Sequence, residues 1–251
     1  MTNIPARHGL RALVTRPRAE AESLVEALAA RGIAAIIEPL LEIHYRSEPA
    51  PDLTGVQAVL CTSASGVRAL ARLTDERAVP LLAVGDASAA RARNEGFARA
   101  ESAGGSLADL VRLARERLRP GDGRLLHVAG STLAGDLAGA LRAEGFAVDR
   151  AVLYEARPAA GLGAASVRAL SAGIVDFALF FSPRTALIFV RLAERAGVAS
   201  AIGAVTAISI SAAADAALEP LRFRERHIAE RPDQPSLLVA LDRVLAERRP
   251  A

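Results

Sequence analysis

The stretch FALFFSPRTALIFV (Phe177–Val190) decides the fold. Its first part is as apolar as a buried strand, and it stops abruptly at Ser182-Pro183. Beyond this break the apolar residues resume at the spacing of a helix. The stretch therefore predicts a strand that turns directly into a helix at Ser182.

The same change from an apolar strand to a helix recurs along the chain. Each short apolar run is followed by a longer stretch rich in alanine, arginine and glutamate, and Gly32, Gly96, Gly145 and Gly197 close four of these stretches. The other apolar runs are RALVTRP, AVLCTS, PLLAVG, RLLHVAG and AVTAISI. A strand, a short loop, a helix and a glycine stop are typical of α/β units on parallel sheets.

Three of these units match three others in the same order. Ser63 aligns with Ser182, Gly85 with Ser209, and Ser106 with Ser236, at offsets of 119, 124 and 130 residues. Ordered matches with slowly growing offsets indicate an internal duplication. We therefore expect two similar three-layer α/β domains with parallel sheets.

Two segments, PLLEIHYRSEP and AVDRAVLYEARP, do not fit the alternation and are expected to be extended. If both cross between the domains, the first domain is discontinuous. The expected boundaries are then 1–40 with 156–251 for the first domain and 41–155 for the second.

Composition excludes several classes of function. All 31 basic residues are arginine, so Schiff-base chemistry on lysine and the lysine-containing phosphate loop are excluded. The four histidines are scattered without cysteine partners, so no metal site is expected. Tryptophan is absent and aromatic residues make up 4%, which disfavours a nucleic-acid platform.

The chain is also expected to be a cytoplasmic protein without a membrane segment. No apolar run approaches the roughly 20 residues of a membrane span, and the first residues lack a signal-peptide core. A single cysteine, Cys61, excludes an intramolecular disulfide framework. The formal net charge of +3 is compatible with an anionic ligand.

Hydroxyls and small residues gather where the predicted strands end and helices begin, the place where open α/β sheets bind ligands. Helix N-termini offer unpaired N–H groups suited to carboxylate or phosphate, although serine and threonine are also ordinary N-caps. Both interpretations stay open for each residue, and the whole set favours an anion-binding cleft. The candidates are Arg16, Thr62, Ser63, Gly85, Ser88, Gly130, Ser131, Ser182 and Ser211.

An ordered series of motifs over nearly the whole chain resembles uroporphyrinogen-III synthase. The motifs are LVTRP, CTSASGV, LLAVGDASA, GRLLHVAG, VLYEARP, FFSPRTALIF and AERPDQPSLLVAL. The resemblance implies two α/β domains joined by a two-stranded extended linker, and a lyase of porphyrin and heme biosynthesis. Such enzymes close hydroxymethylbilane, a linear tetrapyrrole, to uroporphyrinogen III by losing water and inverting the D ring, without a cofactor or metal.

The resemblance also implies roles for particular residues and partners. Tyr154 matches the tyrosine that the family places at its cleft, where a phenol can assist departure of hydroxide; the alternative is a linker tyrosine that only packs. We expect a monomer that contacts hydroxymethylbilane synthase transiently.

One corner departs from the family pattern IGxxTA. Ser209 stands at the glycine and Ala212 at the threonine, and the hydroxyl of Ser211 lies about 100° away around the helix. This departure keeps open a non-catalytic module of the same fold that binds a tetrapyrrole or another anion. A third interpretation is a two-domain protein similar to solute-binding proteins.

Overall fold

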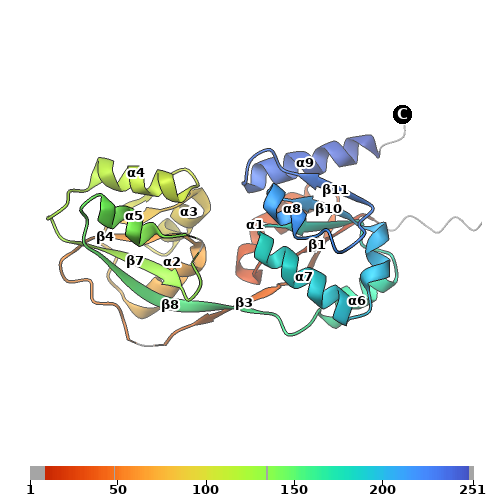
Figure 1. Cartoon of the computed structure of the whole chain (residues 1–251), viewed down its shortest axis with the longest axis horizontal. Coiled ribbons are helices and arrows are strands. Elements are labelled where there is room, and N and C mark those ends of the chain that lie inside the picture. The colour runs from red at the N-terminus through yellow and green to blue at the C-terminus, as the bar shows by residue number, and fades with distance from the viewer. Residues whose placement is uncertain (1–8, 48, 134, 249–251) are drawn as a thin grey trace, which may run out of the picture. The chain divides into compact units, whose positions relative to one another are not determined.

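The computed structural model describes residues 9–47, 49–133 and 135–248. Contacts divide the chain into two units (Figure 1). Unit 1 holds the described residues up to Glu42 and from Pro158 onward, and unit 2 is Ile43–Arg157. These boundaries lie two residues beyond those expected from the sequence.

Unit 1 is a five-stranded sheet in the order β11-β10-β9-β1-β2 between two layers of helices. Every pairing in it is parallel. Successive strand residues alternate between two cores, one under α1 and α9 and the other under α6, α7 and α8. Its strands are β1 (Arg11–Val14), β2 (Ala34–Ile37), β9 (Phe177–Phe180), β10 (Thr206–Ser209) and β11 (Glu225–Ile228). Its helices are η1 (Arg18–Glu20), α1 (Glu22–Ala29), α6 (Ala164–Ser171), α7 (Pro183–Arg195), η2 (Ala199–Ala204), α8 (Ala212–Ala216) and α9 (Gln234–Glu247).

Unit 2 repeats this arrangement on a six-stranded sheet in the order β3-β8-β7-β4-β5-β6. One core lies under α2 and α3, the other under α4 and α5. Its strands are β3 (Leu41–Tyr45), β4 (Val56–Cys61), β5 (Leu81–Ala83), β6 (Ala100–Ser102), β7 (Arg124–Gly130) and β8 (Val148–Pro158). Its helices are α2 (Ala64–Leu73), α3 (Asp86–Asn94), α4 (Leu107–Arg117) and α5 (Leu137–Ala143).

The two sheets share one strand order. The series β6-β5-β4-β7-β8 in unit 2 corresponds to β11-β10-β9-β1-β2 in unit 1. In unit 1 the last two strands of this series come from the start of the chain, which makes the unit discontinuous. Two similar α/β domains with parallel sheets are thereby confirmed.

Strands β3 and β8 form the two-stranded linker. Arg46 N donates to Leu153 O at 2.9 Å, and Ala159 N donates to Leu40 O at 3.0 Å. Residue numbers therefore increase along β3 while those of its partners in β8 decrease. The pair is therefore antiparallel, unlike the other pairings of the two sheets.

Three strands escape detection in the sequence, namely β2, β6 and β11. Each lies at the edge of its sheet. An edge strand pairs on one side and keeps much of its surface in water. Strands β6 and β11 accordingly carry no continuous apolar run, whereas β2 has the apolar sequence AAII but is only partly buried. The basic stretch LRFRERHIAERP contains β11, whose residues are mostly exposed, so it is both a strand and a solvated surface.

His127 of β7 is an unusual core residue. Only 1% of its surface is exposed, and neither ring nitrogen makes a hydrogen bond to a described residue. Its neighbours in the register of the sheet are Leu60 and Arg150. Burial, and secondarily the positive charge of Arg150, lowers the pKa of His127 below 6.5. The ring is therefore held neutral in the folded protein.

This burial predicts a loss of stability in acid. Because the pKa is lowered in the folded state, the unfolded chain binds more protons below pH about 6.5, and acid favours unfolding. We expect wild type to lose free energy of unfolding relative to His127→Leu as pH falls through this range. Urea titrations at several pH values measure this difference, and parallel pH profiles for the two proteins would contradict it.

Candidate functional site

Four strand-to-helix corners share one backbone geometry. Ser63, Gly85, Ser182 and Ser211 are the N-caps of α2, α3, α7 and α8. Their φ angles lie between −155° and −165° and their ψ angles between 155° and 172°. In this extended conformation the chain leaves a parallel strand and enters a helix within two residues. Each corner therefore presents a helix N-terminus at the carboxyl edge of a sheet.

The three serines cap their helices. Ser63 Oγ accepts the N–H of Gly66 at 3.0 Å, Ser182 Oγ that of Thr185 at 3.1 Å, and Ser211 Oγ that of Ala214 at 3.3 Å. The capping interpretation is therefore correct for all three. Capping uses a lone pair of the hydroxyl oxygen and leaves its proton to donate elsewhere. At Ser182 this proton goes to Thr185 Oγ1, whose own proton goes to Ser182 O.

Unit 2 brings Ser63, Gly130, Ser131 and Tyr154 together. The phenol oxygen of Tyr154 lies 2.8 Å from Ser63 Oγ, and Ser131 N donates to Tyr154 O at 3.0 Å. A Cβ at Gly130 would lie 2.9 Å from Cε2 and Cζ of the tyrosine ring. Gly130 therefore lets the ring lie against the backbone of β7. Thr62, which is partly exposed, directly precedes this cap.

Gly130 and Ser131 do not begin a helix, contrary to expectation. Helix α5 starts at Leu137, where Asp136 accepts the N–H of Gly139 at 2.8 Å. The sequence STLAGD separates strand and helix. Ser131 donates its N–H to the backbone carbonyl of Tyr154, and Gly130 leaves room for the phenol ring. This corner therefore accommodates Tyr154 and does not supply a helix N-terminus.

The corner at Gly85 is the least suited to an anion. Asp86, the first residue of α3, is exposed and places a carboxylate at the helix N-terminus. This charge opposes binding of a second carboxylate. Ser88, one turn later, is buried with 7% of its surface exposed.

Arg16 follows β1 in unit 1. Its Cζ lies 4.4 Å from the ring centroid of Phe181, and Nη1 donates to Oε1 of Gln234 at 2.8 Å. Burial lowers the pKa of Arg16, while Glu20, with Oε2 3.8 Å from Nη2, raises it. The guanidinium stays charged, and its direction is fixed by Phe181 and Gln234.

Gln234 and Phe181 were not among the residues proposed from the sequence. Gln234 opens α9 within AERPDQPSLLVAL, and Phe181 directly precedes the cap of α7. Both segments belong to the internal repeat, and this match is the feature of the sequence that could have identified the two residues.

The register of the sheets corrects the alignment of the fourth corner. Cys61 pairs with Ala83 in unit 2, and Phe180 pairs with Ser209 in unit 1. Ser63 lies two residues after Cys61, and Ser182 lies two residues after Phe180, so Cys61 and Phe180 are equivalent positions. Their partners in the sheets, Ala83 and Ser209, are then also equivalent. Two residues further on, Ser211 corresponds to Gly85.

The serine at the glycine position is therefore Ser211, and it is an N-cap. A Cβ at Gly85 would make only ordinary contact, 3.6 Å from Cα of Gly105, so serine suits this geometry. Ala214 then corresponds to Ser88, and no hydroxyl occupies that position in unit 1. Ser209 is a buried strand residue whose Oγ bonds to no described residue.

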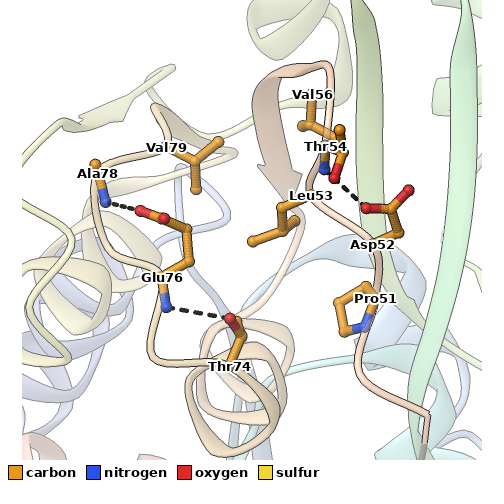
Figure 2. A pocket seen from close by; sticks show the side chains of 9 residues that line it. All are labelled: Pro51, Asp52, Leu53, Thr54, Val56, Thr74, Glu76, Ala78 and Val79. Carbon is orange, nitrogen blue, oxygen red and sulfur yellow. Dashed lines mark hydrogen bonds between the residues drawn. The ribbon is translucent and has the colours of Figure 1, made fainter.

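A hollow of about 560 Å³ lies elsewhere in unit 2, and Figure 2 shows the side chains that line it. It lies beside the loops that lead into β4 and β5, at the amino ends of these strands, so it is not at the corners. Its polar groups bond to neighbouring protein groups: Asp52 accepts from Thr54 N and from Arg124 Nη2 of β7, and Glu76 accepts from Ala78 N. None of the proposed site residues lines it.

In the described part of the chain, histidine, cysteine, aspartate and glutamate form no group of three that could hold a metal ion. Among the same residues, every helix is too short or too polar to cross a membrane.

Ser209 and Ser211 are predicted to affect stability in opposite directions. Ser209→Ala removes a buried unpaired hydroxyl and is expected to leave the free energy of unfolding unchanged or raise it by about 1 kcal/mol. Ser211→Ala removes a cap and is expected to lower it by ~1 kcal/mol. Denaturant titrations of both variants test the pair, and a clear loss for Ser209→Ala would show that its hydroxyl is paired.

Comparisons with known proteins agree with this geometry. The structure resembles uroporphyrinogen-III synthetase from Helicobacter pylori 26695, with a TM-score of 0.63 and 17% identity over 95% of this chain and 100% of that one. It also resembles a mutant uroporphyrinogen III synthase from the extremely thermophilic bacterium Thermus thermophilus, with a TM-score of 0.52 and 20% identity at the same coverage. At these identities the likeness establishes the fold.

No curated protein sequence matches the chain. The family model described as uroporphyrinogen-III synthase HemD matches residues 22–239, which is most of the sequence. The chain therefore belongs to the uroporphyrinogen-III synthase family.

Proposed function

We propose that the chain is a catalytically active uroporphyrinogen-III synthase. It converts hydroxymethylbilane to uroporphyrinogen III by loss of water, ring closure and inversion of the D ring. Family membership supports the reaction. The observation that carries an active site is the phenol of Tyr154 held 2.8 Å from the cap hydroxyl of α2.

The substrate is a polyanion, with acetate and propionate arms on every ring. The caps at Ser63, Ser182 and Ser211 provide helix N-termini for such carboxylates. Arg16 adds a fixed positive charge beside the corner of α7 in unit 1. The absence of lysine is compatible with this binding, because helix N–H groups supply partial positive charge and arginine supplies full positive charge.

Tyr154 acts as the general acid in this proposal. The C–O bond of the hydroxymethyl group breaks, its electron pair leaves with oxygen, and the phenol proton completes a molecule of water. The nitrogen of the same pyrrole supplies electrons to form the azafulvenium cation. The D ring attacks to give the spiro intermediate, which fragments and closes again. The proton lost in the final closure restores the phenol.

This scheme needs no cofactor. Loss of water and exchange of carbon–carbon bonds leave the oxidation state of the tetrapyrrole unchanged, so no electron acceptor takes part. Acid–base chemistry and positioning supply the rate increase. We further propose a monomer in the cytoplasm that receives its unstable substrate through transient contact with hydroxymethylbilane synthase.

The non-catalytic alternative loses its main support. It rested on Ser209 standing at the glycine of the fourth corner, where a Cβ would crowd a ligand. The register of the sheet assigns that position to Ser211, whose geometry matches Gly85. A serine there keeps a helix N-terminus and adds a cap.

A coupled assay tests this function. Hydroxymethylbilane is generated in place, the purified protein is added, and the oxidised products are separated as type I and type III isomers. Wild type is expected to give mainly type III. Tyr154→Phe is expected to lower turnover about 10²-fold, the lower end of the range for a general acid, with affinity for the product nearly unchanged.

Tyr45→Phe is the matched control, because it removes the only other phenol in the chain. Tyr45 lies in β3 with Arg72 over its ring and has no assigned role in the reaction. Type I isomer at the spontaneous level from folded wild type would reject the synthase. Full activity in Tyr154→Phe would remove Tyr154 from the chemistry.

A further inference from the structure

The cap of α2 differs from the other serine caps in its second contact. Ser63 Oγ accepts the N–H of Gly66 at 3.0 Å and lies 2.8 Å from the phenol oxygen of Tyr154. Ser182 and Ser106 also cap helices, but their hydroxyls lie near Thr185 and Asp109 respectively. Ser63 alone among these three caps therefore joins a helix N-terminus to a phenol.

The bonding capacity of a hydroxyl limits the possible arrangements. Ser63 Oγ already accepts one N–H, and it has a single proton to donate. If that proton points to Tyr154, the phenol proton is not committed to Ser63. The developing phenolate then faces a hydroxyl whose polarity is reinforced by the first turn of α2.

We propose that Ser63 is a positioning residue, whose hydroxyl donates to the Tyr154 oxygen and stabilises the phenolate that forms when the tyrosine gives up its proton. The inference deepens the proposed function and rests on it for its catalytic meaning. It gives Ser63 a role other than the contact with substrate expected from the sequence. Tyr154 remains the group that reacts.

Gly130 supports the same arrangement by leaving room for the ring against β7. A Cβ there would lie 2.9 Å from Cε2 and Cζ and 3.2 Å from the phenol oxygen. These distances are closer than real Cβ contacts or at their lower limit, so a side chain at 130 must displace the ring. Because Gly130 lies in β7 and Ser63 caps α2, the two residues allow independent perturbation of one phenol.

The proton movement balances within this pair and the substrate. Tyr154 transfers its proton to the leaving oxygen, which departs as water. The negative charge left on the phenol oxygen is met by the hydroxyl of Ser63, which moves no proton itself. The proton that the D ring loses on final closure returns to the phenolate. Ser63 thus changes the energy of an intermediate state and not the stoichiometry.

The phenol can be observed directly, because the chain has no tryptophan and two tyrosines. In a Tyr45→Phe background, the phenolate absorbance reports Tyr154 alone. Adding Ser63→Ala is expected to move this ionisation upward by about one pH unit, as expected for loss of one hydrogen bond to a charged group. Ser63→Thr retains a hydroxyl and is expected to restore the original ionisation.

Ser106→Ala is the matched control in the same unit. Ser106 caps α4 through a capping box, in which its hydrogen bonds go to Asp109. Its loss is expected to lower the free energy of unfolding as much as the loss of Ser63, because each change removes one cap. It is expected to leave the Tyr154 ionisation and the turnover unchanged.

Kinetics complete the test. Ser63→Ala is expected to lower kcat about ten-fold with KM unchanged, and Ser63→Thr to recover most of it. Gly130→Ala is expected to shift the ionisation in the same direction as Ser63→Ala. Circular dichroism of each variant confirms that the fold is retained.

The outcomes separate the two proposals. If Ser63→Ala and Ser106→Ala ionise Tyr154 at the same pH, the positioning role is overturned, whatever the activity. If Ser63→Ala raises KM at constant kcat, Ser63 contacts substrate instead. An inactive wild type would reject the synthase, while the titration still decides whether Ser63 controls the phenol.

Discussion

The extended N-cap is the constraint on which the rest of the structure depends. At Ser63, Gly85, Ser182 and Ser211 the chain keeps strand-like angles for one residue and then enters a helix. This conformation lets a helix begin at the carboxyl edge of the sheet and return along its face, as parallel pairing requires. The same geometry leaves first-turn N–H groups at that edge, so the demands of folding also create the chemistry for carboxylates.

The same corner occurs in both units of the duplicated fold, and the two copies differ in the residues around it. Unit 2 keeps a phenol and a glycine seat at its central corner, through Tyr154, Ser63 and Gly130. Unit 1 has Arg16 over Phe181 beside the equivalent corner at Ser182. The phenol proposed as the acid therefore belongs to one copy and the fixed guanidinium to the other.

Much of this was predictable from local patterns, and the rest depended on the sheet. Continuous apolar runs ending in Ser or Gly identified the central strands, because those strands are buried on both faces. The edge strands β6 and β11 lack such runs and were missed, and the short apolar edge strand β2 was missed as well. The two-residue shift from Ser209 to Ser211 needed the strand register, and the Ser63–Tyr154 contact joins residues 91 positions apart. Candidate site residues could therefore be proposed from the sequence as a set, while the contacts among them came from tertiary geometry.

The central claim is that helix N-termini at these corners hold the carboxylates of the tetrapyrrole. Backbone amide NMR during titration with uroporphyrinogen III tests it most directly. The first turn of α2, residues 64–66, is expected to shift, while the first turn of α4, residues 107–109, whose cap is closed by Asp109, stays unchanged. Equal shifts at α2 and α4, or none at α2 with bound product, would contradict the account.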